Sequence, residues 1–204
     1  MTKTIVLAGS LVLTLAGMAI AAEEKKAAAA PPEMSPEQKA MMEAYEKMGA
    51  VREEHKQLAY FAGNWDAKAT FWMDPKADPV TDSAKATVEP RFDGRYLHMV
   101  YKGNYQGQPF TGEGLIGFDN LKNKHYVTWI DSMSTGIWVG SGTYDAARKT
   151  YTYHGEMPDP MKPSTVVKMR QVSRIVDDKH YVFESYETHD GKEAKTMQIE
   201  YSRL

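Results

Sequence analysis

From Trp65 to the C-terminus, apolar and polar residues alternate with a period of two, and turn-forming residues interrupt the pattern at regular intervals. A period of two places neighbouring side chains on opposite faces of a strand, so this pattern predicts β-strands. Met197, Ile199 and Tyr201, for example, share one side of the last segment. We expect ten strands, over residues 65–73, 83–92, 95–103, 110–118, 125–131, 137–144, 150–156, 165–176, 180–188 and 194–203.

The connections between these segments are short and carry turn residues such as Asp93-Gly94, Asp119-Asn120 and Asp190-Gly191. Consecutive strands should therefore pair antiparallel, and closing the sheet into a barrel would remove its two exposed edges. The sequence thus predicts an all-β, up-and-down antiparallel barrel over residues 50–204. Gln171 and Ser173 fall on the apolar side of their strand, which suits a barrel that holds water or a ligand.

One helix should precede the barrel, within residues 35–49. Ser35-Pro36-Glu37-Gln38 reads as a capping box with proline at the first helical position, and Gly49 ends the segment. Met41, Met42, Tyr45 and Met48 share one face of this helix, and we interpret them as a packing face. A second short helical turn is expected around residues 53–61.

The N-terminus has the pattern of a secretory signal peptide over residues 1–21. Lys3 precedes an apolar run over residues 5–20, and Ala19-Ile20-Ala21 supplies a small-x-small cleavage site. The alternative is an uncleaved anchor, for which the run is short. Residues 22–34 mix alanine, charge and proline and are expected to form a disordered leader. The mature chain is then expected to be periplasmic or secreted, with no membrane span.

Composition narrows the classes of function. The formal net charge of -2 gives no basic surface of the kind that phosphate backbones require, so nucleic acid is not expected as a partner. The chain has no cysteine, which excludes disulfides, thiolate catalysis and cysteine-based zinc sites. Its six histidines show no metal-binding spacing, so no metal site is predicted.

A short helix followed by Gly63-Asn64-Trp65 resembles the N-terminal signature of the calycins, the superfamily of lipocalins and fatty-acid-binding proteins. That resemblance implies that Arg203, on the last strand, stacks over Trp65 and closes one end of the barrel by a cation–π contact. The alternative for these two residues is an ordinary core tryptophan and a solvated terminal arginine.

Residues 55–203 also resemble the bacterial domain of unknown function family 1579. This resemblance adds to the expectation for the fold and implies no activity. The matching stretches are His55-x-x-Leu58-x-x-Phe61-x-Gly63-x-Trp65, Asp93-Gly94-Arg95-Tyr96-Leu97, Gly107-x-Pro109-Phe110-x-Gly112-x-Gly114, Gly117-Phe118-Asp119-Asn120, the run from Trp129 to Gly136, and Tyr201-Ser202-Arg203.

The run from Trp129 to Gly136 is the densest group of chemically useful side chains. It joins two predicted strands at a barrel rim, where barrels bind ligands, and it contains Trp129, Asp131 and Met133. Trp129 and Asp131 fall on the same strand face as His125, so both could look into the cavity. The alternative is that Asp131 and Ser134 merely cap a tight turn through local hydrogen bonds.

His98 and His154 lie within predicted strands and could face the interior, where a lone imidazole ligates haem or transfers protons. Haem is therefore an alternative cofactor, although no cofactor is predicted outright; covalent haem is excluded by the absence of cysteine. A structural role for both histidines is the alternative.

These features support three functional hypotheses. The leading one is an exported barrel that binds a small, partly apolar molecule. The second is an enzyme in which Asp131 converges with His98 or His154 in one pocket. The third is an interaction protein of the envelope that docks through its methionine-rich helix, which would require an exposed apolar helix face.

Overall fold

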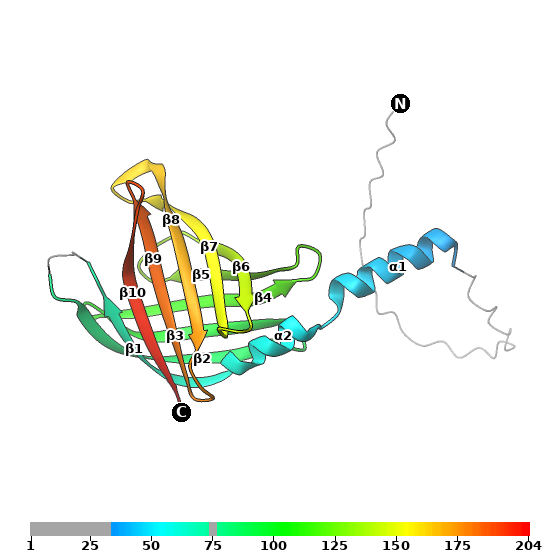
Figure 1. Ribbon diagram of the computed structural model, residues 1–204, viewed down its shortest axis with the longest axis horizontal. Coiled ribbons are helices and arrows are strands. Elements are labelled where there is room, and N and C mark those ends of the chain that lie inside the picture. Colours follow the sequence, from blue (N-terminus) through cyan, green and yellow to red (C-terminus); the bar gives the residue numbers. More distant parts are fainter. Residues whose placement is uncertain (1–33, 74–76) are drawn as a thin grey trace, which may run out of the picture.

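The computed structural model describes residues 34–73 and 77–204 (Figure 1). The predicted signal peptide and nearly all of the predicted leader lie outside these residues. Two α-helices and a 3-10 turn precede the strands: α1 (Pro36–Gly49), α2 (Glu53–Leu58) and η1 (Ala59–Phe61). The strands are β1 (Gly63–Phe71), β2 (Val80–Arg91), β3 (Tyr96–Tyr105), β4 (Gln108–Asp119), β5 (Lys124–Asp131), β6 (Trp138–Asp145), β7 (Thr150–Asp159), β8 (Lys162–Ile175), β9 (His180–His189) and β10 (Lys192–Arg203).

The strands form one closed antiparallel barrel in which each strand pairs with its neighbours in the chain and β10 pairs with β1. The predicted ten-stranded up-and-down barrel is confirmed. β2 begins at Val80 rather than Ser83, and β8 begins at Lys162 rather than Thr165. Polar hairpin residues continue the backbone ladder there, although they lack the apolar alternation by which a strand is predicted.

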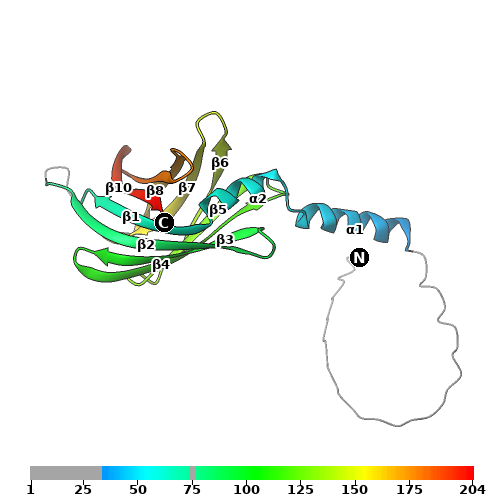
Figure 2. The ribbon, with the colours of Figure 1, turned by 90° about the horizontal axis from the view of Figure 1, so that it is seen from below.

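α2 and η1 cover one end of the barrel (Figure 2). Leu58 and Phe61 turn their side chains into the barrel and are buried. The Trp65 side chain beside them has no exposed surface, and its Nε1 donates a hydrogen bond to the Phe61 carbonyl at 2.9 Å. Because buried indole nitrogens need an acceptor, this bond fixes η1 to the first strand. We call this end of the barrel the closed end.

The chain's last strand returns to the same place. Trp65 pairs with Arg203 in the β1–β10 ladder, and the Arg203 Cζ lies 4.0 Å from the Trp65 ring centroid. The guanidinium also donates hydrogen bonds to the carbonyl oxygens of Tyr60 and Ala62. The stacking that the calycin resemblance implied is present, and it joins β1, β10 and η1.

Helix α1 has the capping box that the sequence predicts, with Ser35 Oγ accepting from Gln38 N and Gln38 Oε1 accepting from Ser35 N. It projects away from the barrel (Figures 1 and 2), and none of its residues is buried. The interpretation of its methionine stripe as a packing face is therefore wrong: the stripe residues are 46–60% exposed. No helix within residues 34–73 and 77–204 is long and apolar enough to cross a bilayer.

The barrel holds α1 only by its C-terminal end. Asn120 Nδ2, in the turn after β4, lies 2.8–3.1 Å from the carbonyl oxygens of Lys47, Met48 and Ala50. Arg95 Nε donates to the Gly49 carbonyl at 2.9 Å. The terminal carbonyls of a helix lack partners within the helix and carry partial negative charge, so these donors cap α1 and fix the point from which it projects.

Candidate functional site

The end of the barrel opposite α2 is its mouth. β1 ends there at Phe71 and β2 begins there at Val80, so odd-numbered strands end and even-numbered strands begin at the mouth. Side chains that alternate with the buried residues of each strand face outward, and the others face the interior. The pairing register therefore shows whether each side chain faces inward or outward, and how far it lies from the mouth.

Several inward side chains are only partly buried. Met99, Val127 and Phe183 face inward, yet each keeps part of its surface accessible to solvent. Inward residues at the closed end, such as Trp65 and Tyr151, have none. Because the wall of a barrel shields inward side chains from outside, their exposure means that water reaches them from within, through the mouth.

Two indoles form part of the inner wall near the mouth. Trp129 on β5 pairs with Trp138 on β6. A Cβ on Gly112 would lie 2.1 Å from the Trp129 ring, and one on Gly140 would lie 2.3 Å from the Trp138 ring. Glycine at these positions lets each indole lie flat against the backbone of the wall instead of projecting across the interior. The glycines thus allow both indoles to lie along the wall.

Asp131 is placed beside this wall and also in the turn that follows it. Its Oδ2 accepts a hydrogen bond from Trp129 Nε1 at 3.1 Å, which orients the indole. Its Oδ1 accepts from the backbone nitrogens of Met133 and Ser134, at 2.9 and 3.1 Å. Both interpretations of Asp131 therefore apply: it faces the interior and it caps the turn. Met133, in that turn, is exposed.

His98 and His154 lie on the outer surface of the barrel, so the expectation that they face the interior is not met. His98 follows buried Leu97 on β3, and its Nε2 lies 3.0 Å from Glu113 Oε2 on the outside of β4. His154 is exposed on β7, where it pairs with Arg170 of β8. Asp131 therefore does not converge with either imidazole, and the acid–base pocket of the enzyme hypothesis is not formed by these residues.

The histidine that does face inward is His125, at the closed end. Its ring packs 4.9 Å from Phe118 and 5.1 Å from Tyr151, measured between centroids, and burial lowers its pKa to about 4. An imidazole enclosed by two rings does not present a nitrogen to the open part of the interior. Neither His98 nor His154 therefore provides the inward imidazole that the haem alternative assigned to them. The described residues also contain no group of three potential metal ligands.

Several inward polar groups were not singled out from the sequence. Ser185 is buried on β9, Trp138 is buried on β6, and neither Ser185 Oγ nor Trp138 Nε1 has a hydrogen-bond partner in the described part of the chain. Asp82 on β2 and Glu187 on β9 also face inward, near the mouth. A buried polar atom that lacks a partner is costly, so such atoms mark places where water or a ligand binds.

Two clefts lie outside the barrel. One runs between α2 and the turn joining β2 to β3, beside His55, Pro90 and Leu97. The other lies between α1 and Arg95. The first is lined largely by apolar atoms and offers few groups to orient a ligand, so we regard the barrel interior as the candidate site.

The comparison with family models matches residues 50–203 to the family described as "Protein of unknown function (DUF1579)". The chain belongs to this family. The match spans the whole barrel, from the residues that precede α2 to Arg203 on β10. No curated protein matches the chain. Membership of DUF1579 therefore identifies the fold and carries no biochemical assignment.

One solved structure supports the same architecture, and a second is similar at a lower TM-score. The crystal structure of Rv2717c from M. tuberculosis is similar to this DUF1579 chain with a TM-score of 0.54 and 12% sequence identity, covering 76% of this chain and 99% of that one. A redesigned β-barrel, mFAP0, bound to DFHBI, gives a TM-score of 0.38 with 16% identity, over 71% of this chain and 99% of that one. At these identities, the likeness to Rv2717c shows the fold alone.

Proposed function

We propose that this protein binds a small, partly apolar molecule inside its barrel, and that the molecule enters through the mouth. The observation that carries the proposal is the combination of partly exposed inward side chains with buried polar atoms that lack partners, Ser185 Oγ and Trp138 Nε1. A water-accessible interior lined by apolar and aromatic groups, with a few polar groups that converge on it, is typical of ligand-binding sites.

The energetics favour an apolar body for this ligand. Each Å² of apolar surface that a ligand and the wall bury together contributes about 25 cal/mol, and the flat faces of Trp129 and Trp138 provide such surface. The polar groups then supply orientation. Trp138 Nε1 donates only, so it requires an acceptor, whereas Ser185 Oγ both donates and accepts.

A fluorescent apolar probe tests this proposal. N-phenyl-1-naphthylamine is uncharged, and its emission rises when it leaves water for an apolar site. We expect saturable binding with a Kd in the micromolar range, on the order of −8 kcal/mol of binding free energy. Probe emission excited through tryptophan should accompany binding, because the paired Trp129 and Trp138 belong to the inner wall that we propose as the site.

Two neighbouring substitutions on β5 provide a matched pair. Val127→Trp places a large side chain in the partly open interior, whereas Thr128→Trp places the same side chain on the outside of the same strand. We expect Val127→Trp to reduce probe affinity at least about tenfold, or about 1.4 kcal/mol, and Thr128→Trp to leave it unchanged. Equal affinities for both variants would reject an interior site.

We also propose that the protein is exported, on the pattern of residues 1–21. Expression of the full chain in a Gram-negative host, followed by fractionation and N-terminal sequencing, tests this. The expected mature N-terminus follows Ala21 or Ala22. A cytoplasmic product that retains Met1 would reject it.

A further inference from the structure

The charged side chains on the inward face of the barrel near its mouth are acidic. Asp82, Asp131 and Glu187 face inward on β2, β5 and β9, which lie on different sides of the barrel. Each is close to the mouth end of its strand: Asp82 is two residues after Val80, Asp131 ends β5, and Glu187 is two residues before His189. The three carboxylates therefore surround the entrance instead of clustering on one strand.

The inward positions lack matching cations. Between Arg203 at the closed end and the hairpin tips, the described inward residues include no lysine or arginine. Arg203 is itself engaged by Trp65 and by backbone carbonyls. At the tip of the β9–β10 hairpin, His189 Nε2 lies 2.9 Å from Glu187 Oε2, and Lys192 pairs with His189. A low-dielectric wall that carries charge of one sign focuses its field on the space that it encloses.

Two of these carboxylates accept hydrogen bonds from neighbouring residues. Asp82 Oδ2 accepts from Gln106 N at 2.9 Å. Asp131 accepts three hydrogen bonds, from Trp129, Met133 and Ser134. All four donors are uncharged backbone or indole N–H groups, so none of them is a cation.

Aromatic faces occupy the same level of the barrel. The Tyr101 and Trp129 rings meet edge to face, with centroids 6.4 Å apart, and Tyr101 meets Phe110 at 5.9 Å. Trp138 lies across from Trp129 on the adjacent strand. The faces of aromatic rings carry negative electrostatic potential and attract cations, as in the aromatic cages that bind quaternary ammonium groups. Carboxylates and rings therefore favour the same sign of charge in a ligand.

A second observation at this level, separate from the carboxylates, concerns buried polar atoms without partners. Ser185 is 1% exposed and Trp138 is 8% exposed, and the polar atoms of both lack partners among the described residues. Ser185 pairs with Gln171 and with Met197, all on inward faces just below Glu187. These groups can orient a polar substituent of a molecule that the aromatic wall holds.

We propose that the barrel mouth selects organic cations: an ammonium group on an apolar or aromatic body, held by the rings of Trp129, Trp138 and Tyr101 within the ring of Asp82, Asp131 and Glu187. The inference rests on the proposed function of the barrel and names its ligand class. It also predicts discrimination against fatty-acid-like anions, because a carboxylate ligand would enter a site that already carries negative charge.

Three ligands that share a benzyl group test the sign of the charge. Benzyltrimethylammonium, its uncharged carbon analogue neopentylbenzene, and the anion phenylacetate compete with N-phenyl-1-naphthylamine for the wild-type protein. We expect the cation to bind at least about tenfold more tightly than the carbon analogue, and phenylacetate to bind most weakly. Equal affinity for cation and carbon analogue, or tighter binding of the anion, would overturn the inference.

Charge-neutralising variants locate the effect. Asp82→Asn with Glu187→Gln removes two inward charges and retains Asp131, which caps its turn. Glu113→Gln with Glu184→Gln removes two outward charges, so both proteins have the same net charge. The inward pair should lose at least about fivefold in affinity for the cation, and the outward pair less than about twofold. Equal losses would attribute the preference to net charge and overturn the assigned residues.

The fluorescent probe distinguishes failure of the proposed ligand class from failure of the proposed binding function. If it binds the wild-type barrel and the cation shows no preference, the ligand class is wrong while the binding function stands. If neither the probe nor any of the three ligands binds, the proposed function itself fails.

Discussion

The Arg203 Cζ lies over the Trp65 ring, 4.0 Å from its centroid, while Nη1 of the same guanidinium donates to the backbone carbonyl of Ala62 at 2.7 Å. One side chain thus holds the last strand, the first strand and the segment before it. Trp65 in turn binds the Phe61 carbonyl. The closed end therefore depends on a single connected network, and the mouth can remain open.

Replacing this guanidinium should destabilise the barrel. Arg203→Met removes the cation–π contact and leaves the carbonyls of Tyr60 and Ala62 without donors. We expect a loss of about 2–4 kcal/mol in the free energy of unfolding, measured by urea denaturation. Arg148→Met, at an exposed arginine paired with Asp145, is the control and should change little. Equal effects of the two substitutions would refute the network.

Burial of His125 predicts a specific pH dependence. Its pKa is about 4 in the folded protein and near 6.5 in the unfolded chain. The unfolded chain therefore binds more protons between these values, so stability is retained above pH 6.5 and falls as the pH decreases toward 4. Burial also lowers the pKa of neighbouring His55, which adds to the same trend, while Glu54 opposes it at both residues.

Urea denaturation at pH 7 and pH 5 measures this effect. We expect the wild type to lose on the order of 1–2 kcal/mol between them. A His125→Phe variant should lose less, since it has no imidazole to protonate. His154→Phe, at an exposed histidine, should keep the wild-type slope. A His125→Phe variant with an undiminished slope would show that another group carries the dependence.

The glycines beneath the indoles should be sensitive to a single methyl group. Gly140→Ala would place its Cβ 2.3 Å from the Trp138 ring, so the indole must move into the interior. We expect a loss of stability of about 1–3 kcal/mol together with weaker probe binding. Gly136→Ala meets nothing within 4 Å and serves as the control. Unchanged probe binding by Gly140→Ala would mean that Trp138 does not line the site.

The tether of α1 can be tested without altering the barrel core. Asn120→Asp replaces a donor by a carboxylate that faces the carbonyls of Lys47, Met48 and Ala50, so the helix end should detach. Amide hydrogen exchange should accelerate in α1 by at least about tenfold and stay unchanged in the strands. Asn123→Asp, in the same connection, is the control. Acceleration throughout the barrel would contradict a local tether.

Much of the fold follows from local patterns in the sequence. The alternation in β10 and the turn pairs such as Asp93-Gly94 determine strands and hairpins, because each depends on residues adjacent in the chain. Closure could be predicted because short connections force neighbouring strands to pair. The exposure of α1 could not, since an apolar stripe is the same whether or not a partner surface lies within reach of the helix.

The site was harder to predict, because the register of each strand decides whether a side chain lies inside or outside the barrel. His98 directly follows Leu97, and His154 directly follows Tyr153. Leu97 and Tyr153 are buried, so strict alternation along the strand would have placed both histidines on the outside. Glu187 and Ser185 lie in the mixed segment of β9, where aromatic residues occur on both faces and the period gives no clear side. The Trp129–Trp138 pair depends on a ladder between two strands that single-strand patterns do not specify.

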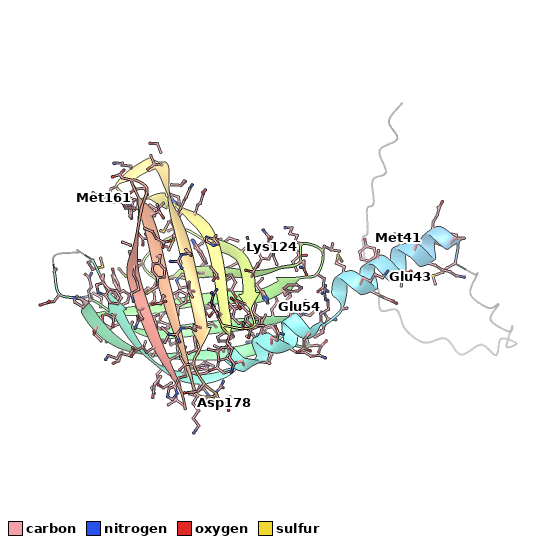
Figure 3. All side chains as sticks on the ribbon, viewed as in Figure 1. Met41, Glu43, Glu54, Lys124, Met161 and Asp178 are labelled. Carbon is pink, nitrogen blue, oxygen red and sulfur yellow. The ribbon has the colours of Figure 1, made fainter. Side chains whose placement is uncertain are left out.

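A binding site inside the barrel requires a hollow interior and a mouth that admits a ligand. Co-crystallisation with a brominated analogue of N-phenyl-1-naphthylamine, with the bromine located by anomalous diffraction, tests this most directly. We expect a bromine peak inside the barrel, within van der Waals distance of Trp129 or Trp138. Figure 1 labels their strands, β5 and β6, and Figure 3 shows the same view with side chains. A peak only in the outer clefts, beside α2 or beside α1, with side chains filling the interior, would contradict it.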